Sequence, residues 1–277
     1  KGVLPGVDFL RRVNLGEEVE VGEKVAVIGG GDVAIDAARM ALRLGAKEIS
    51  IVYRRTKEEM PANAEEVEEA EDEKIRILYL LAPTSILTEN GRVKGMECVR
   101  MELGDYDESG RRRPTPVKGS EFIMKVDTII PEVGYKPELT CFKPEEGFKM
   151  TRAGTLAPDP LTLATHIPGV FAGGDVVTGP STIVQAMAHG YQAAVSIDRY
   201  LKGQDLYKDR VYLPLRRADV PKGEGETGEV EAIKPRARMP YMGVGRRVRT
   251  FSEVNLGFSE ETALREACRC LRCDLEH

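Results

Sequence analysis

Short β-branched apolar runs alternate with a helical spacing of apolar residues in the first part of the chain. Residues 24–28 (Lys-Val-Ala-Val-Ile) form an apolar run bounded by glycines, the pattern of a buried parallel strand. Residues 32–44 place Val33, Ala37, Ala41 and Leu44 on one helical face, and Gly45 ends it. Residues 49–53 follow as a second strand. The pattern predicts a β-α-β unit of about 30 residues.

Alternating runs dominate the region after this unit. Runs such as 75–81 and 93–103 are joined by Asn90-Gly91 and by a polar loop over 105–116. These predict meander strands appended to the parallel sheet. A further strand is expected at 126–130, ahead of Gly134.

Residues 63–74 form a highly acidic stretch with helical spacing. Its only apolar contacts are expected from Ala64, Val67 and Ala70. We interpret its charge as a solvated face rather than a catalytic cluster.

The second half of the chain carries one long helix and an irregular arm. Residues 169–172 read as a strand that enters Gly173-Gly174-Asp175, and 181–201 as a helix. Residues 203–251 are rich in Pro, Gly and Arg without periodicity, which predicts an extended arm packed along a neighbour. A last helix is expected over 259–268, with the Ser259 hydroxyl as its cap.

Composition narrows the function classes. The chain has 277 residues, 42% apolar and 31% charged, which is typical of a soluble globular protein. A formal charge of −5 argues against nucleic-acid or anionic-membrane partners. Residues 1–5 lack the apolar core of a signal peptide, and no run approaches the roughly 18 apolar residues of a membrane helix. We expect a cytoplasmic protein.

A dinucleotide fingerprint lies between the first strand and the first helix. In Gly29-x-Gly31-x-x-Ala34, Gly29 permits the tight turn, Gly31 lets the backbone approach a pyrophosphate, and Ala34 keeps the helix close to the sheet. The anion would lie on the free amides of the helix start. The predicted binding residues are Gly29, Gly30, Gly31, Asp32, Val33 and Ala34. The alternative interpretation is a plain strand-to-helix turn.

Arginines stand where an NAD-specific protein carries an acidic residue. Tyr53-Arg54-Arg55 ends the second strand, and guanidinium groups pair with a 2′-phosphate where a carboxylate would accept from a ribose hydroxyl. This favours NADPH over NADH. The alternative is that Arg54 and Arg55 are solvated surface residues.

A second glycine-acid element precedes the long helix. Asp175, after Gly173-Gly174, can hold a ribityl hydroxyl near a flavin pyrophosphate. The helix start near Pro180-Ser181-Thr182 could point at the flavin N1/O2 edge. A glycine-rich turn without a ligand is the alternative.

Three of the five cysteines crowd at the end of the chain. Cys268, Cys270 and Cys273 suggest metal ligation rather than a disulfide framework, whereas Cys98 and Cys141 stand alone. Reduced thiols at a frayed end are the alternative.

Taken together, these motifs resemble those of one family. The run 27–39, Tyr53-Arg54-Arg55, residues 59–62 and residues 169–182 are similar to the glutamate synthase small-subunit family, which includes flavoprotein subunits of NADPH:ferredoxin transhydrogenases. The resemblance covers residues 1–273. It implies an NAD(P)H domain inserted into an FAD domain, nucleotide contact at Gly134, and hydride transfer from nicotinamide C4 to flavin N5.

Three departures from this family bear on the expectations. Family members carry an earlier glycine motif for the FAD pyrophosphate, upstream of this chain, so half the flavin site is expected to be missing. Glu132 stands where the family has a small residue before Gly134. Cys270 and Cys273 look like the start of an iron-sulfur ligand set, but four thiolates normally hold a [4Fe-4S] cluster.

These observations predict an α/β protein: a Rossmann-like NAD(P)-binding domain with a parallel sheet and an added meander, plus the C-terminal half of an FAD-binding domain. We expect a connector at 1–20, the NAD(P)H domain at 21–135, the flavin half at 136–203, an arm with the cysteine motif at 204–274, and a tag remnant at 275–277.

The predicted function is an oxidoreductase that moves a hydride from NADPH (or NADH) to FAD. Electrons would then pass to an iron-sulfur centre or to a partner electron-transfer subunit. The candidate for that centre is a [4Fe-4S] cluster in the intact parent. Two alternatives stay open: a non-catalytic nucleotide-binding or assembly module, and a thioredoxin-reductase-like flavoenzyme. The latter needs a Cys-x-x-Cys beside the flavin, and in this chain that spacing occurs only at Cys270 and Cys273.

Overall fold

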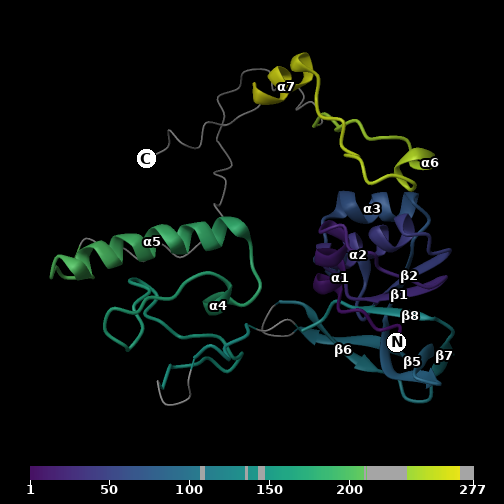
Figure 1. Cartoon of the computed structure of the whole chain (residues 1–277), viewed down its shortest axis with the longest axis horizontal. Helices are drawn as coiled ribbons and strands as arrows, with labels where there is room; N and C mark the ends of the chain where they lie inside the picture. The colour runs from purple at the N-terminus through teal and green to yellow at the C-terminus, as the bar shows by residue number, and fades with distance from the viewer. Residues whose placement is uncertain (107–109, 135–136, 143–146, 209, 211–235, 269–277) are drawn as a thin grey trace. The chain divides into compact units, whose positions relative to one another are not determined.

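Four strands form a parallel sheet in the order β3-β2-β1-β8 (Figure 1). The computed structural model describes residues 1–106, 110–134, 137–142, 147–208, 210 and 236–268. The sheet strands are β1 (Lys24–Ile28), β2 (Glu48–Tyr53), β3 (Arg76–Tyr79) and β8 (Thr128–Pro131). The sheet belongs to the first of two compact units, which comprises Lys1–Val133 with Glu231–His277.

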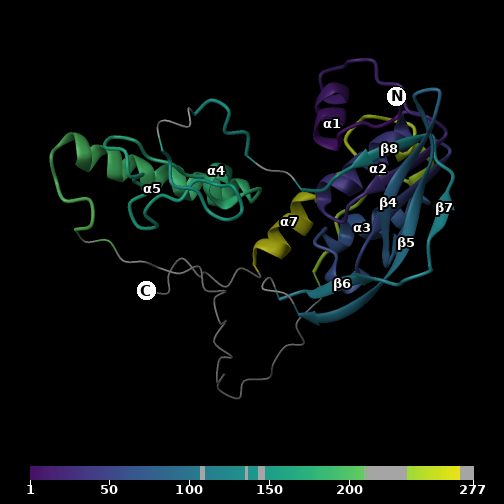
Figure 2. The same ribbon diagram turned by 90° about the horizontal axis from the view of Figure 1, so that it is seen from below.

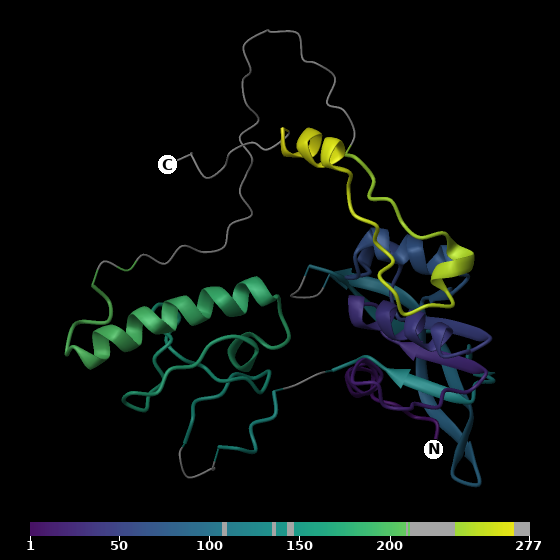
Figure 3. The same cartoon turned by 45° about the horizontal axis from the view of Figure 1, so that its top comes forward.

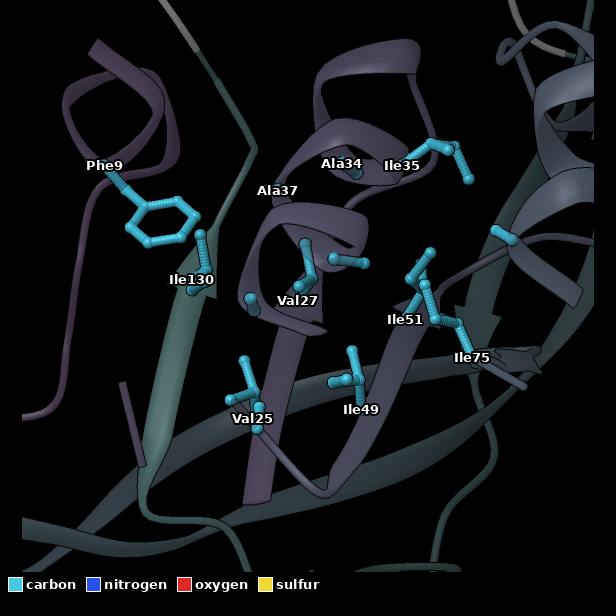
Figure 4. Close-up of a cluster of buried hydrophobic side chains, with 14 of the residues drawn as sticks. Phe9, Val25, Val27, Ala34, Ile35, Ala37, Ile49, Ile51, Ile75 and Ile130 are labelled. Carbon is cyan, nitrogen blue, oxygen red and sulfur yellow. The ribbon is translucent and has the colours of Figure 1, made fainter. Parts of the chain in front are cut away.

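Helices cover one face of this sheet. They are α1 (Gly6–Asn14), α2 (Asp32–Arg43) and α3 (Ala64–Asp72). Side chains alternate between the faces of a strand, so Val25 and Val27 of β1 point toward the helices and Ala26 toward the other side. Figure 4 shows the helix-side cluster, in which Phe9 of α1 packs near Ile130 of β8. Burial of these side chains fixes the helices on the sheet.

An antiparallel meander covers the opposite face, and its strands lie side by side (Figure 2). It consists of β4 (Leu81–Glu89), β5 (Arg92–Tyr106), β6 (Arg112–Pro116) and β7 (Phe122–Met124). Asn90 and Gly91 both have positive φ, 51° and 73°, as a two-residue type I′ hairpin turn requires. The Asn90-Gly91 turn predicted from sequence is therefore confirmed.

The C-terminal segment of the first unit returns to the helical face. It contains α6 (Val244–Arg247) and α7 (Glu260–Ala267), and α6 lies beside α3 (Figures 1 and 3). The guanidinium of Arg247 donates to the carbonyl of Glu69 at 3.1 Å. The helix predicted at the end of the chain is confirmed, with the Ser259 hydroxyl accepting from the Thr262 amide.

The second unit, Gly134–Val230, is built from loops and two helices among its described residues. These are the single turn α4 (Asp175–Thr178) and the long α5 (Ile183–Leu201), which lies along the loops of the unit (Figure 2). The strand predicted at 169–172 is wrong. Only Phe171 forms a bridge, with Ala164, because no longer strand lies beside this segment among the described residues.

Three further differences from the sequence-based expectations concern local structure. The run at 75–81 does not start the meander, because β3 joins the parallel sheet. Leu80, with φ 54°, separates β3 from β4. The segment before residue 20 contains α1, a helix that the sequence pattern did not predict. The segment expected as an arm contains α6, and Arg247 of this helix contacts α3 of the same chain.

The charge of α3 is not all solvated, contrary to the sequence-based interpretation. The side chain of Glu73, which caps the C-terminus of α3, is 0% exposed and contacts Arg39 at 2.8 Å, Arg43 at 3.1 Å and Arg247 at 3.0 Å. Glu69 pairs with Arg39 at 2.8 Å. Ion pairs with arginines allow these carboxylates to be buried.

Candidate functional site

The fingerprint glycines form the turn between β1 and α2. Gly29 has φ +153°, and its amide donates to the Val52 carbonyl at 3.1 Å. Gly31 is the extended N-cap of α2, with φ −93°. Its carbonyl accepts from the Ala34 amide at 2.9 Å, so the helix begins directly after the glycine loop.

Four successive backbone amides are open at this helix start. Within the part of the chain that the structure describes, the amides of Gly30, Gly31, Asp32 and Val33 donate no hydrogen bond. Such N–H groups at the positive end of a helix bind an anion well. The geometry is that of a phosphate cradle.

The three glycines serve different steric purposes. A Cβ at Gly29 would lie 2.7 Å from the Glu132 carbonyl oxygen, and one at Gly30 would lie 2.4 Å from the Tyr53 ring. A Cβ at Gly31 would meet nothing within 4 Å. The space beside Gly31, next to the free amides, is therefore open.

Ala34 lies where the fingerprint predicts. Its side chain is fully buried, and a Cβ at Gly29 would be 3.3 Å from the Ala34 Cβ. A larger residue at position 34 would push α2 away from the sheet. The predicted structural role of Ala34 thus agrees with the packing.

A loop that sequence reasoning took up only through the family resemblance borders the cradle. The Ala62 amide donates to the Gly30 carbonyl at 3.1 Å, and the Asn63 amide donates to Asp32 Oδ1 at 2.8 Å. The Asp32 side chain thus holds the start of α3, where Asn63 caps the helix. Its predicted contact with the coenzyme can come from its backbone amide.

Tyr53 and Glu59 brace the end of β2. The Tyr53 hydroxyl donates to the Glu59 carbonyl at 2.7 Å, and Arg112 of β6 donates to Glu59 Oε1 at 2.8 Å. Burial would raise the pKa of Glu59, but hydrogen bonds from Arg112 and Thr56 lower it below its ordinary value. Glu59 therefore stays ionised and ties β6 of the meander to the loop that follows β2.

The structure separates the two predicted phosphate-binding arginines. Arg54 is exposed, and its side chain has no hydrogen bond or ion pair among the described residues. Arg55 is 4% exposed, and its Nε donates to the Arg112 carbonyl at 2.8 Å. Arg54 is thus the one with a free guanidinium, and Arg55 is anchored within the fold.

Glu132 follows β8 at the carboxyl edge of the sheet. Its amide donates to the Ile28 carbonyl at 2.7 Å, next to the glycine loop. Its carboxylate turns toward the first turn of α1: Oε1 lies 1.2 Å from where a Cβ of Gly6 would be. The carboxylate of this residue, which the family resemblance expects to be small, therefore lies beside the start of α1. Gly134 itself is exposed with φ +73°.

In the second unit, the glycine-acid element forms a turn that starts α4. Gly174, with φ +72°, is the N-cap of α4, and Asp175 is its exposed first residue. Pro180, Ser181 and Thr182 are exposed at the start of α5, where the Thr182 hydroxyl accepts from the Gln185 amide at 3.3 Å. The predicted helix start is confirmed; contact of these residues with a flavin stays a prediction.

His189 is the residue of this element that sequence reasoning set aside as structural. Its Nδ1 accepts the Gly174 amide at 2.9 Å. No spacing pattern in the sequence indicates this contact, because it joins α5 to a loop fifteen positions earlier.

The predicted ligands Cys270 and Cys273 lie outside the described residues. Within the described ranges, no group of three or more His, Cys, Asp or Glu side chains is placed to hold a metal ion. In the same ranges, no helix has the length and apolarity to cross a membrane.

Comparison with known proteins gives the family. Residues 1–190 match the pyridine nucleotide-disulphide oxidoreductase family. The chain is 44% identical over 276 residues to the NADP(+)-dependent formate dehydrogenase subunit beta of Moorella thermoacetica, covering 98% of this chain and 39% of that protein. It is 38% identical to the NADPH-Fe(3+) oxidoreductase subunit beta of Geobacter sulfurreducens, covering 99% of this chain and 44% of that protein.

The glutamate synthase resemblance is confirmed by the same comparison. The small chain of glutamate synthase [NADPH] from Azospirillum brasilense is 38% identical over 215 residues, covering 73% of this chain and 44% of that protein. The chain thus spans less than half the length of these relatives.

Solved structures agree on the fold. Thioredoxin reductase from T. acidophilum matches with a TM-score of 0.52 and 25% identity, covering 66% of this chain and 53% of that one. Mycobacterium tuberculosis FprA in complex with NADPH matches with a TM-score of 0.55 at 19% identity over the same shares, which shows the fold alone. The α/β class with a Rossmann-like parallel sheet is therefore confirmed. With the family pattern matching more than half of its residues, the chain belongs to the pyridine nucleotide-disulphide oxidoreductase family of enzymes.

Proposed function

We propose that this chain is the NADPH-binding part of a flavoprotein oxidoreductase that moves a hydride from NADPH to FAD. Electrons then leave to an iron-sulfur centre or a partner subunit. The flavin, when bound, supplies the conversion between hydride transfer and single-electron release. The residues of this chain position the two nucleotides and supply the electrostatic field around them.

The open amide cradle at Gly30 to Val33 carries this proposal. A pyrophosphate there would receive four N–H groups and the positive end of α2. The clear space beside Gly31 admits the phosphates close to the backbone. The packed Gly29, Gly30 and Ala34 keep the loop in this conformation without a ligand.

Coenzyme choice falls to Arg54 in this proposal. A free guanidinium after the end of β2 suits a 2′-phosphate, which it can bind through paired N–H groups. Arg55 contributes by holding the hairpin of β5 and β6 over the same strand end. The proposal therefore gives NADPH preference over NADH.

The flavin half of the proposal is supported by the unusual orientation of α5. Its polar side packs on its own unit, where Gln192 donates to the Pro160 and Leu161 carbonyls at 2.8 Å. Its apolar side is exposed, with Ile183 at 81% and Tyr191 at 77%. An apolar helix face of this size needs a cover. The longer relatives have a part that this chain does not span. We propose that the corresponding part of the intact protein covers the apolar face of α5 and completes the flavin site.

The partner follows from what the relatives are called. Two of them are named as beta subunits and one as a small chain, so each works beside another subunit. We propose that this protein also hands electrons to a partner subunit, with Cys270 and Cys273 as part of an iron-sulfur path. The thioredoxin-reductase-like alternative is disfavoured because this chain offers Cys-x-x-Cys only at that site.

Anaerobic titration of the full-length protein tests the function. When it is reconstituted with FAD, its flavin absorbance at about 450 nm should fall on addition of NADPH, and at a higher rate than with NADH. Arg54→Ala should remove this difference, and Arg76→Ala is the matched control. Arg76 is also exposed, but it begins β3, whereas Arg54 follows the end of the parallel strand β2. The two arginines therefore lie at opposite ends of the parallel strands.

A protein that holds FAD but is bleached by neither coenzyme would contradict the oxidoreductase proposal. That result would favour the second candidate, a nucleotide-binding module that only stabilises a complex. The cradle alone fits both functions, because it explains binding without electron transfer.

A further inference from the structure

His189 lies on the polar side of α5 and touches the glycine-acid element directly. A Cβ at Gly173 would lie 2.8 Å from the His189 Cβ, so this backbone packs against the histidine with no space for a side chain. The next residue, Gly174, donates its amide to His189 Nδ1 at 2.9 Å. His189 therefore packs its Cβ against Gly173 and accepts from Gly174 through its imidazole, and these are the two glycines that precede Asp175.

This hydrogen bond fixes the protonation state of the ring. A backbone N–H can only donate, so Nδ1 must carry a lone pair and the ring proton must be on Nε2. A doubly protonated imidazole would present N–H toward N–H, and the bond would be lost. The conformation of Gly174, with φ +72° at the N-cap of α4, thus depends on a neutral His189.

We propose that His189 is a positioning residue for the flavin: its neutral imidazole holds Gly174 and Asp175 in the conformation that receives the cofactor. The proposal rests on the proposed function, because it requires a flavin at Asp175. It predicts flavin binding that depends on a hydrogen-bond acceptor at this position of α5.

Few charged groups surround His189. On α5 its neighbours at one turn, Gln185 and Gln192, are neutral. On the packed loop, Asp175 follows the donor Gly174, and Asp159 accepts from Thr162 and Tyr207 instead. Arg210 donates to the Leu161 carbonyl and the Ser196 hydroxyl. Among the described residues none of these groups forms an ion pair with His189, and the Gly174 amide is its polar contact.

Asparagine and glutamine at position 189 separate this role from a helix effect. Asn Oδ1 is attached at the same distance along the side chain as His Nδ1, so it can accept from Gly174 and does not titrate. Gln carries its acceptor one bond further out. Intrinsic helix propensity favours Gln over Asn, so an effect on α5 stability alone would give the opposite order.

The experiment measures the FAD dissociation constant of full-length apoprotein at pH 8. His189→Asn should bind FAD as wild type does, because it keeps the acceptor. His189→Gln and His189→Ala should bind FAD about tenfold more weakly. His166→Asn is the control for replacing a histidine elsewhere in the same unit.

Two results would overturn the inference. His189→Gln could bind like wild type, or His189→Asn could bind as weakly as His189→Ala. In these cases FAD still binds, so the proposed function stands. Wild-type protein that binds no FAD would instead overturn the proposed function, and this inference with it. Circular dichroism identifies variants that fail to fold, and the Asn–Gln comparison does not need the alanine variant.

Discussion

The guanidinium of Arg247 lies 3.0 Å from the carboxylate of Glu73 and joins α6 to the end of α3. Both side chains are buried, at 4% and 0% exposure, and Arg39 and Arg43 of α2 reach the same carboxylate. One carboxylate thus connects three helices, the last of which precedes the cysteine-bearing end of the chain. This contact holds the C-terminal segment on the rest of the first unit.

Replacing Arg247 by Ala should reduce the free energy of unfolding by about 2 kcal/mol, because Glu73 keeps two other arginines but loses its third. Urea denaturation measures this loss. Arg249→Ala is the matched control, since Arg249 is exposed, and it should change stability by less than about 0.5 kcal/mol. Equal losses for the two variants would show that the contact contributes nothing specific.

The pH dependence of stability should carry a contribution from Glu73. Burial raises the pKa of its carboxyl, but hydrogen bonds from Arg39 and Arg43 outweigh burial and leave the pKa below 4.5. A folded-state pKa below the unfolded one means that the stabilisation is present above about pH 4.5 and is lost as the pH falls through the folded pKa.

Glu73→Gln should therefore cost about 3 kcal/mol at pH 7 and make stability less sensitive to pH below 5. Thermal unfolding between pH 7 and pH 3 checks this, with the exposed Glu68→Gln as control. A variant with the acid sensitivity of wild type would place the dependence on other carboxylates.

Alanine at two adjacent glycines should affect different properties of the protein. Gly30→Ala places a Cβ 2.4 Å from the Tyr53 ring and should destabilise the fold by about 1–3 kcal/mol. Gly31→Ala meets nothing and should leave stability unchanged while weakening NADPH binding at least about tenfold. Denaturation and coenzyme titration on both variants separate the effects. Unchanged NADPH affinity in Gly31→Ala would argue against a pyrophosphate at the cradle.

Arg54 and Arg55 should separate in the same way. Arg54→Ala should weaken NADPH by about 10- to 100-fold, equivalent to about 1.4–3 kcal/mol, with NADH little changed. Arg55→Ala removes a buried hydrogen bond to the Arg112 carbonyl, so its main effect should be a lower free energy of unfolding. Isothermal titration with both coenzymes tests this. Equal losses of NADPH and NADH in Arg54→Ala would contradict its assignment to the 2′-phosphate.

Cysteine labelling should distinguish buried from exposed thiols. Burial, with a smaller effect of Glu97, raises the pKa of Cys98 to about 11, so it stays protonated and covered at pH 8. Cys141 and Cys268 are exposed. Iodoacetamide with site-resolved mass spectrometry should modify these two in the native protein and Cys98 only after denaturation. Native labelling of Cys98 would show that the meander opens.

Local sequence patterns were sufficient for the central unit of the fold and for the cradle. β1, α2 and β2 lie where strand runs and helical spacing predict, because each pattern is decided by residues a few positions apart. The roles of Gly29, Gly31 and Ala34 follow from the same short stretch.

Other features depended on partners far away in the sequence. β3 could have joined either sheet, and only its pairing with β2 decided it. The burial of Glu73 depends on Arg247 in a segment without periodicity, and the role of His189 on its contact with Gly174.

The sequence by itself determined the β-α-β unit with its glycine loop and the oxidoreductase family, because both depend on short local motifs. The tertiary structure decided which arginine is free, which acids are buried and which histidine holds the second glycine turn. The physical reason is that burial and hydrogen-bond pairing depend on which distant surfaces meet, and a local pattern contains no record of that.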